Sequence, residues 1–399
     1  MKKVSLVIIF IFICCFSIMH SQSAKKQLKL INSVTLNDKE FFEEISFQNK
    51  FGYFIIPVNI GNESYEYIFD TGGYNTLTSD IMEKNALPNL MDVQVGSSNK
   101  LKSKIALTQI PSAKIGGINF KDIGALNFDF DDSPQIKCYT NGGLIGKSII
   151  KTAVWQLNAK EEKIMLTDDI EKLSHLENAI KLKVKFNKVF DPFIEAKING
   201  KKVSFMLDFG FGGFVSLTEK DGINLSSQGM VEIEGEGSVS ANGVVNESIF
   251  IKSLDNFEIG NMSIPNEVAH YAKSNNYNLI GTEIAKHFIV TLNFKDKELF
   301  LTPIDKMEEP KLSFGFNLNR NDKNMYVSRV YKDGSADKKG LKLNDVIISI
   351  NDEKFNEASY CDFYDYINEL LKGNENIKLG IERNNELQTI NIAKRDLFN

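Results

Sequence analysis

The sequence is poor in cysteine and histidine, with 4 of each among 399 residues. Two of the cysteines lie in an apolar N-terminal run, which leaves Cys138 and Cys361 for the rest of the chain, in regions that we assign to different domains. We therefore do not expect a framework of disulfides to stabilise the protein. No His-Glu-x-x-His pair and no Gly-x-Ser-x-Gly motif occurs, which argues against zinc-dependent and serine-type hydrolysis. No metal or cofactor is expected.

The sequence also lacks a large excess of positive or negative charge. The 47 Lys and Arg residues against 52 Asp and Glu give a net charge of -5, and both signs are interspersed. No basic stripe that would neutralise phosphates is present, so nucleic acid is not an expected partner. A hydrophobic share of 42% is ordinary for a globular protein. The length predicts two or three domains.

The longest apolar run stands at the N-terminus, over residues 4–19, after Met1-Lys2-Lys3 and before small and polar residues. This pattern is typical of a signal peptide. The run is shorter than the roughly 20 apolar residues that span a bilayer. We therefore expect residues 1–22 to direct export, to the periplasm or out of the cell, and no stable membrane span afterwards. An N-terminal membrane anchor is the alternative.

The rest of the chain contains an internal repeat. The segment LIGKSIIK at residues 144–151 recurs as LIGTEIAK at residues 279–286, and each copy leads to a Leu-Asn and a Leu-Thr pair. Upstream, a run of β-branched and aromatic residues ends in Asp70 in one half and in Asp208 in the other. Such runs, broken by Gly and Asn, are typical of strands and hairpins. The repeat predicts two mostly β lobes, with a short helix after each hydrophobic-hydrophobic-Gly element.

Asp followed by x-Gly at a strand end, once in each half, indicates a pair of carboxylates. Such a strand can turn sharply and present its Asp at a surface. If the two lobes face each other, Asp70 and Asp208 meet and share one proton. The charged member can then activate a water against a peptide carbonyl while the other protonates the developing oxyanion. A single Asp-x-Gly would indicate only a surface turn, so the duplication carries the argument.

These motifs resemble two signatures of the pepsin/retropepsin-like aspartic proteases, Asp-Thr-Gly and hydrophobic-hydrophobic-Gly. The similar segments are residues 69–72 and 144–146 in the first half and 207–210 and 279–281 in the second. The resemblance implies a bilobal, β-barrel body with lobes over residues 40–172 and 180–304. It also implies an aspartic endopeptidase with Asp70 and Asp208 as catalytic dyad, acting as a monomer on protein or peptide substrates.

The resemblance implies supporting roles beside the dyad. Thr71 would brace it across the lobe interface, and hairpins near residues 96–100 and 235–243 would be flaps that cover the substrate. The supporting glycines would be Gly72, Gly210, Gly146 and Gly281, the last two close behind the dyad. Phe209 departs from the family, because it stands where a second bracing Thr is expected. A catalytically weak or inactive peptide-binding or scaffolding protein of the same fold is therefore the alternative function.

Beyond a polar linker near residues 305–310 a different pattern begins. The segments SFGF at 313–316, VSRV at 327–330 and GLKLNDVIISIN at 340–351 resemble PDZ domains, over residues 311–396 and with an α+β fold. The resemblance implies that a helix near residues 361–371 forms one wall of a peptide site. The other wall would be the loop whose backbone N–H groups bind a peptide's terminal carboxylate: Ser313, Phe314, Gly315 and Phe316.

One position of this pattern departs from the usual residue. Asn344 replaces a commoner Gly, but Asn tolerates the left-handed backbone that the turn requires. Two alternatives remain for the domain: it merely packs on the body, or it regulates a partner while the body is only structural.

Overall fold

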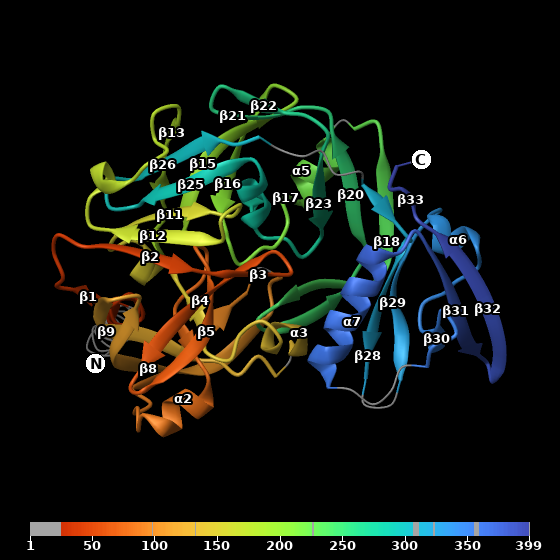
Figure 1. Cartoon of the computed structure of the whole chain (residues 1–399), viewed down its shortest axis with the longest axis horizontal. Coiled ribbons are helices and arrows are strands. Elements are labelled where there is room, and N and C mark those ends of the chain that lie inside the picture. Colours follow the sequence, from red (N-terminus) through yellow and green to blue (C-terminus); the bar gives the residue numbers. More distant parts are fainter. Residues whose placement is uncertain are drawn as a thin grey trace, which may run out of the picture.

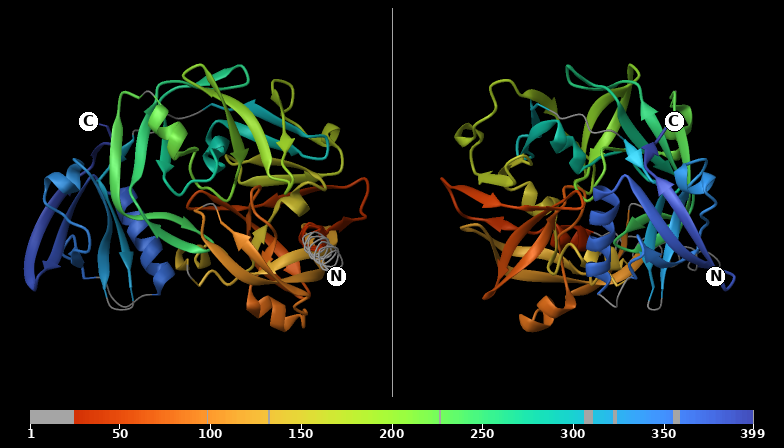
Figure 2. Two further views of the ribbon diagram at one scale, coloured as in Figure 1. Left: turned by 180° about the vertical axis from the view of Figure 1, so that it is seen from behind. Right: turned by 45° about the vertical axis from the view of Figure 1, so that its right-hand side comes forward.

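The computed structural model describes residues 25–97, 99–131, 133–225, 227–305, 311–321, 324–354 and 359–398. The expected signal peptide lies outside these residues. The described chain is mostly β, in two halves and a C-terminal domain. In Figure 1 the second half lies above the first, and the C-terminal domain lies beside both at one end of the long axis; Figure 2 shows the same arrangement from two other sides. None of the described helices is long and apolar enough to cross a membrane.

A nine-stranded sheet forms the first half, with the main path β1-β9-β8-β4-β5-β10. Buried and exposed side chains alternate along strands that have one face in the core. In β4, Ile56, Val58 and Ile60 point into the core. The strands are β1 (Thr35–Leu36), β3 (Gln48–Lys50), β4 (Tyr53–Ile60), β5 (Glu63–Phe69), β6 (Thr76–Leu77), β7 (Met91–Gly96), β8 (Lys102–Ile115), β9 (Ile118–Asn127) and β10 (Gly143–Ile145). The helices after β1 are α2 (Ser79–Lys84), α3 (Pro134–Lys137) and α4 (Lys147–Ile150).

The second half repeats this plan. The strand that ends at each Asp pairs in parallel with the strand of the hydrophobic-hydrophobic-Gly element, β5 with β10 and β16 with β24. A short helix follows each element, α4 and the 3-10 helix η2 (Thr282–Lys286), as the repeat predicted. The other elements are β14 (Lys185–Phe186), β15 (Pro192–Ile198), β16 (Lys201–Leu207), β17 (Val215–Thr218), α5 (Glu219–Asn224), β18 (Met230–Ser240), β19 (Gly243–Asn246), β20 (Ile249–Leu254), β21 (Phe257–Ile259), β22 (Met262–Ile264), β23 (Glu267–Ala272) and β24 (Leu279–Ile280).

A six-stranded sheet joins the halves, in the order β13-β26-β25-β11-β12-β2. At its centre β11 and β25, which follow the two copies of the repeat, pair antiparallel with Trp155 opposite Leu292. Every residue of these two strands is buried, because both faces of the sheet are covered. The elements are β2 (Phe42–Ser46), β11 (Val154–Asn158), β12 (Lys163–Thr167), the 3-10 helix η1 (Ile170–Lys172), β13 (Ile180–Lys183), β25 (Phe288–Asn293) and β26 (Glu298–Pro303).

The C-terminal domain has a core of its own, with Val327, Phe363 and Leu379 fully buried. Its long helix starts at a capping box formed by Ser359 and Asp362. Its elements are β27 (Leu312–Ser313), β28 (Phe316–Arg320), β29 (Met325–Tyr331), α6 (Ser335–Lys338), β30 (Val346–Ile350), α7 (Tyr360–Gly373), β31 (Asn376–Arg383), β32 (Glu386–Ala393) and β33 (Arg395–Asp396).

The C-terminal domain is continuous with the second half. Strand β18 pairs antiparallel with β29, so that β14 to β24 of the second half and β28 to β32 of the domain form one 16-stranded sheet. Strands β27 and β33 pair with each other in a separate sheet. Helix α7 lies on the side of the domain that faces the first half, next to α3 (Figure 1). The domain therefore contacts both halves of the body.

Candidate functional site

The structure brings Asp70 and Asp208 together. The backbone N–H of Asp70 donates to the C=O of Ile145 at 2.9 Å, and the N–H of Asp208 donates to the C=O of Ile280 at 2.9 Å. The hydrophobic-hydrophobic-Gly elements thus hold the two residues in equivalent positions. Both side chains are buried, and each carboxyl group influences the pKa of the other.

The glycines of the two turns hold these carboxylates. The N–H groups of Gly72 and Gly73 donate to Asp70 Oδ1 at 2.8 and 2.9 Å, and that of Gly210 donates to Asp208 Oδ1 at 3.0 Å. A Cβ at Gly72 would lie 2.6 Å from Asp208 Oδ1, and one at Gly210 would lie 2.8 Å from Asp70 Oδ2. Each turn therefore faces the opposite carboxylate so closely that no side chain fits.

Gly146 and Gly281 lie against the segments that follow the two Asp residues. A Cβ at Gly146 would lie 2.4 Å from the carbonyl carbon of Tyr74, and one at Gly281 would lie 2.2 Å from the carbonyl oxygen of Phe211. Because backbone passes this close, only glycine fits at either position. The two supporting glycines therefore pack directly against the chain that leaves the dyad.

Thr71 bridges the two halves through its hydroxyl. Thr71 Oγ1 donates to the C=O of Leu207 at 2.7 Å and accepts from the N–H of Phe209 at 3.0 Å. Phe209 offers no hydroxyl in return. Its fully buried ring instead packs edge-on against Phe54 at 5.7 Å and lies 6.5 Å from Phe69, in the core of the first half. Aromatic packing thus takes the place of the second hydroxyl bridge.

The two carboxyl groups have different environments. Burial raises the pKa of Asp208 well above its usual range, and the negative charge of Asp70 adds to the rise. Burial also raises the pKa of Asp70, but the N–H groups of Gly72 and Gly73 offset part of that rise because they stabilise the charged form. The surrounding N–H groups therefore favour the charged form more at Asp70, which accepts two of them, than at Asp208, which accepts one.

A buried ion pair that sequence reasoning missed lies next to this site. Lys147 Nζ pairs with Asp191, and the side chains are only 3% and 9% exposed. The backbone N–H of Lys147 also donates to the C=O of Gly73 at 3.0 Å, which ties this pair to the first turn. The charge of Lys147 is one of the influences that lower the pKa of Asp70, and that of Asp191 adds to the rise at Asp208.

The predicted peptide-binding loop of the C-terminal domain, Ser313 to Phe316, lies at the start of β28. Gly315 has a φ of +80°, and its C=O accepts from the N–H of Tyr331 at 2.9 Å. Its N–H donates to Ser313 Oγ at 3.0 Å, so one backbone amide of the loop is hydrogen-bonded within the loop itself. Asn344 adopts the left-handed conformation expected of it, with a φ of 65°.

The sequence model of the PDZ domain family matches the chain over residues 313–393. Residues 313–393 form a PDZ domain. No curated protein matches the chain. The PDZ domain places α7 opposite β28, where Tyr360 OH donates to Asn319 Oδ1 at 2.7 Å. Among the residues that the structure describes, no cluster of His, Cys, Asp and Glu is suited to hold a metal ion.

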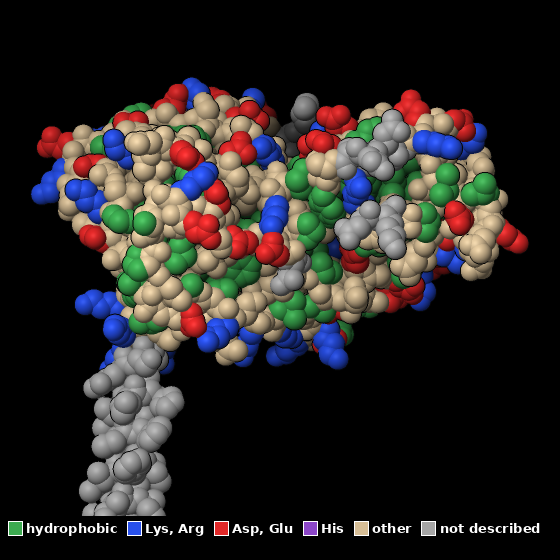
Figure 3. All heavy atoms as spheres, turned by 90° about the horizontal axis from the view of Figure 1, so that it is seen from below, with side chains coloured by type: hydrophobic (Ala, Val, Ile, Leu, Met, Phe, Trp, Pro, Cys, Tyr) green, Lys and Arg blue, Asp and Glu red, His purple; other side chains and the backbone are tan. Residues whose placement is uncertain are grey.

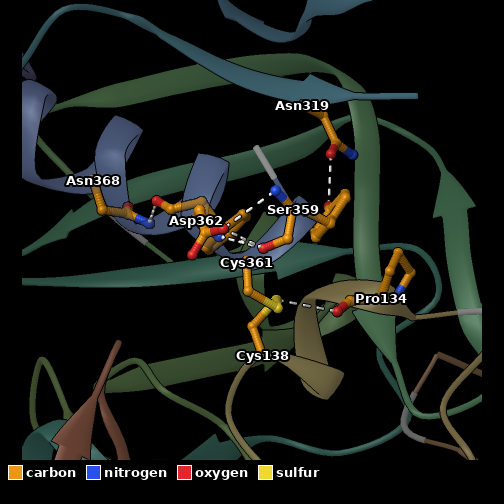
Figure 4. The surroundings of a disulfide bond; sticks show 9 residues. Pro134, Cys138, Asn319, Ser359, Cys361, Asp362 and Asn368 are labelled. Carbon is orange, nitrogen blue, oxygen red and sulfur yellow. Dashed lines mark hydrogen bonds between the residues drawn. A yellow bond between two sulfur atoms is a disulfide. The ribbon is translucent and has the colours of Figure 1, made fainter. Parts of the chain in front are cut away.

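A disulfide ties the PDZ domain to the first half. Cys138, directly after α3, bonds to Cys361 in the first turn of α7, with a Cα–Cα distance of 5.2 Å (Figure 4). The expectation that disulfides do not stabilise this chain is corrected by this bond, which joins residues 223 positions apart. The sequence assigned the two cysteines to different domains, but no local pattern indicated that they meet.

The two hairpins predicted as flaps meet at their tips. Asn99, between β7 and β8, donates through Nδ2 to the C=O of Gly243 at 3.0 Å. It also accepts at Oδ1 from the hydroxyl of Ser240 at 2.8 Å. Gly235, by contrast, lies within β18 and opposite Arg329 of the PDZ domain, away from the tip. The second hairpin therefore extends from the PDZ sheet to the first half.

The PDZ domain holds the base of this second hairpin through side chains as well. Glu236 accepts from Asn319 Nδ2 at 2.9 Å and from Tyr326 OH at 2.6 Å. Arg329 donates to the C=O of Gly237 at 2.6 Å and to the C=O of Glu236. These long-range contacts had no signal in the sequence.

Proposed function

We propose that the chain is an exported aspartic endopeptidase of the pepsin/retropepsin-like type, with Asp70 and Asp208 as the catalytic dyad. The observation that carries this proposal is the meeting of two buried carboxyl groups at equivalent positions of a duplicated plan. Strongly shifted carboxyl pKa values that arise from burial plus a charge partner are typical of catalytic sites. Both carboxylates come from one chain, so a monomer suffices for the proposed activity.

The proposed reaction follows from the difference between the two carboxyl groups. Ionised Asp70 takes a proton from a water whose oxygen attacks the peptide carbonyl carbon, while Asp208 gives its proton to the developing carbonyl oxygen. The tetrahedral intermediate then collapses, Asp208 recovers its proton and the proton on Asp70 passes to the leaving amine. The C–N bond breaks and a carboxylic acid and an amine are formed.

The departure at Phe209 does not remove the support for this proposal. The Thr71 hydroxyl makes both a donated and an accepted hydrogen bond across the halves, and the Phe209 ring packs in the opposite core. A dyad displaced by about 1 Å would lose on the order of a hundredfold in rate, so such bracing matters. The disulfide supports the export part of the proposal, since disulfides persist in oxidising compartments.

We further propose that the PDZ domain binds peptide tails, because this is the general activity of such domains. The loop Ser313 to Phe316 and helix α7 would form the site. In this account the domain presents or selects substrates for the neighbouring dyad.

Cleavage of an unfolded protein by the purified chain, from acidic to neutral pH, tests the proposed activity. We expect fragments from the parent and none from Asp70→Asn or Asp208→Asn. A folded parent that cleaves nothing at any pH would favour the alternative, a peptide-binding or scaffolding protein in which Phe209 marks lost catalysis.

A further inference from the structure

Four aromatic rings form a continuous cluster between the first half and the PDZ domain. The ring of Tyr364 on α7 lies edge-on to Phe51 at 5.4 Å and to Tyr139 at 6.3 Å. Tyr139 in turn stacks on Tyr53 at 5.2 Å. Three of the rings therefore come from the first half, and the fourth is contributed by the PDZ domain.

This cluster reaches the dyad through Tyr53. A Cβ at Gly212, four residues beyond Asp208, would lie 3.5 Å from Cζ of Tyr53. Burial raises the pKa of Tyr53, and the charges of Tyr364, Asp208 and Asp70 add to the rise. The Tyr53 phenol therefore lies within electrostatic reach of both carboxyl groups of the dyad. The rings thus run outward from the dyad to α7.

Part of the cluster is open to contact. Phe51 is 37% exposed, and Tyr53 and Tyr364 are half-buried, whereas Tyr139 is almost fully covered. On the face seen in Figure 3, hydrophobic side chains gather where the body meets the C-terminal domain. Exposed aromatic faces beside a polar dyad offer apolar area and ring edges to an incoming side chain.

The PDZ domain is held against the body on two sides. The disulfide between Cys138 and Cys361 attaches α7 one turn before Tyr364. On the other side of the domain, β29 pairs with β18 of the second half. Because the disulfide and the sheet ladder fix α7 relative to the body, the Tyr364 ring is part of a rigid surface. Rigid placement of this kind suits substrate recognition.

We propose that Tyr364 of the PDZ domain is a specificity-determining residue of the protease site, and forms with Phe51 and Tyr53, over the covered ring of Tyr139, a subsite for an aromatic side chain of the substrate. The inference rests on the proposed function, because it deepens what the dyad region binds. It assigns the PDZ domain a second role, as a wall of the protease site, distinct from binding peptide tails.

The test measures binding rather than turnover. The probe is a short peptide with a non-hydrolysable hydroxyethylene isostere in place of one peptide bond and an amidated C-terminus, which denies the PDZ loop its carboxylate. Two versions carry Phe or Ala on each side of the isostere. Their dissociation constants are measured by calorimetry on the full oxidised chain and on three variants: Tyr364→Ala, Tyr364→Phe and Tyr366→Ala.

We expect the parent to bind the Phe peptide more tightly than the Ala peptide, and Tyr364→Ala to lose roughly tenfold of that preference. Tyr364→Phe keeps the ring and should keep the preference. Tyr366, on the same helix but packed on the PDZ core, is the control for damage to the domain, and its Ala variant should keep the preference too.

Three results would overturn the proposal: a parent without preference for Phe, an unchanged preference in Tyr364→Ala, or equally tighter binding of both peptides in that variant. The last would mean that the ring blocks the site rather than shapes it. The proposed function fails separately, if the parent binds the Phe peptide with the expected preference but cleaves no protein.

Discussion

The hydroxyl of Thr71 accepts the backbone N–H of Phe209 at 3.0 Å, and this one contact ties together the turns that carry the two dyad residues. The same hydroxyl donates to Leu207 at 2.7 Å. Because Phe209 has no side-chain hydroxyl and contributes only aromatic packing, the Thr71 hydroxyl supplies the polar bridge between the turns from the first half alone. The geometry of the dyad should therefore be unusually sensitive to this single oxygen.

Replacing Thr71 by Val keeps the shape of the side chain but leaves the Phe209 N–H and the Leu207 C=O without their partner. An unsatisfied buried polar group costs about 1–3 kcal/mol, so the free energy of unfolding should fall by about that amount. Proteolytic kcat/KM should fall by about ten- to a hundredfold, since the turns shift. Thr71→Ser is the matched control, and a Val variant with the parent's stability and rate would disprove the bracing role.

Replacing the buried pair Lys147–Asp191 by Lys147→Met with Asp191→Asn should narrow the pH profile of cleavage. Burial raises the pKa of Asp70 and Lys147 offsets part of the rise, so without Lys147 the acidic limb should move to higher pH. Burial and the Asp70 charge raise the pKa of Asp208 and Asp191 adds to it, so without Asp191 the alkaline limb should move to lower pH.

The measurement for this pair is kcat/KM against pH, whose two limbs report the ionisation of the free enzyme. The exposed ion pair Lys202–Glu195 provides the control. Replacing it with Lys202→Met and Glu195→Gln should leave both limbs in place. Limbs that move outward in the Lys147 and Asp191 variant would contradict the assigned charges.

Removing the disulfide by Cys138→Ser with Cys361→Ser should cost stability but not detach the PDZ domain. The cross-link closes a loop of 223 residues, and loss of such a bond typically costs about 2–5 kcal/mol. The ladder between β18 and β29 remains. Denaturant unfolding with and without reductant measures the effect. Reductant should lower the denaturant midpoint of unfolding for the parent and leave that of the variant unchanged. Free thiols titrated in the native oxidised parent would disprove the bond.

The sequence predicted the parts of this protein that repeat or follow a family pattern. The duplicated Asp and Gly positions indicated a meeting of Asp70 and Asp208, and the Asn344 turn followed from what Asn tolerates. The Lys147–Asp191 pair, the bond between Cys138 and Cys361 and the ladder between β18 and β29 escaped prediction. Each joins segments far apart in the chain, and no periodicity or turn chemistry specifies which distant partner a side chain meets.

Replacing Glu236 by Ala should loosen the second flap hairpin. Its carboxylate accepts from Asn319 and Tyr326, and the Ala variant leaves both donors without it. Amide hydrogen exchange over residues 236–246 should become faster, because local opening costs less free energy. Glu236→Gln keeps one acceptor oxygen and should show a smaller change. Exchange at parent rates in the Ala variant would show that the PDZ domain does not restrain the hairpin.

The most direct test of the dyad compares kcat/KM for Asp70→Asn, Asp208→Asn and the double variant on one peptide substrate. If the two carboxyl groups act as one acid–base unit, each single variant should lose at least about a thousandfold, and the double variant should lose no more than either. Circular dichroism confirms that all variants are folded. Additive losses, or a single variant that cleaves at the parent's rate, would contradict the account.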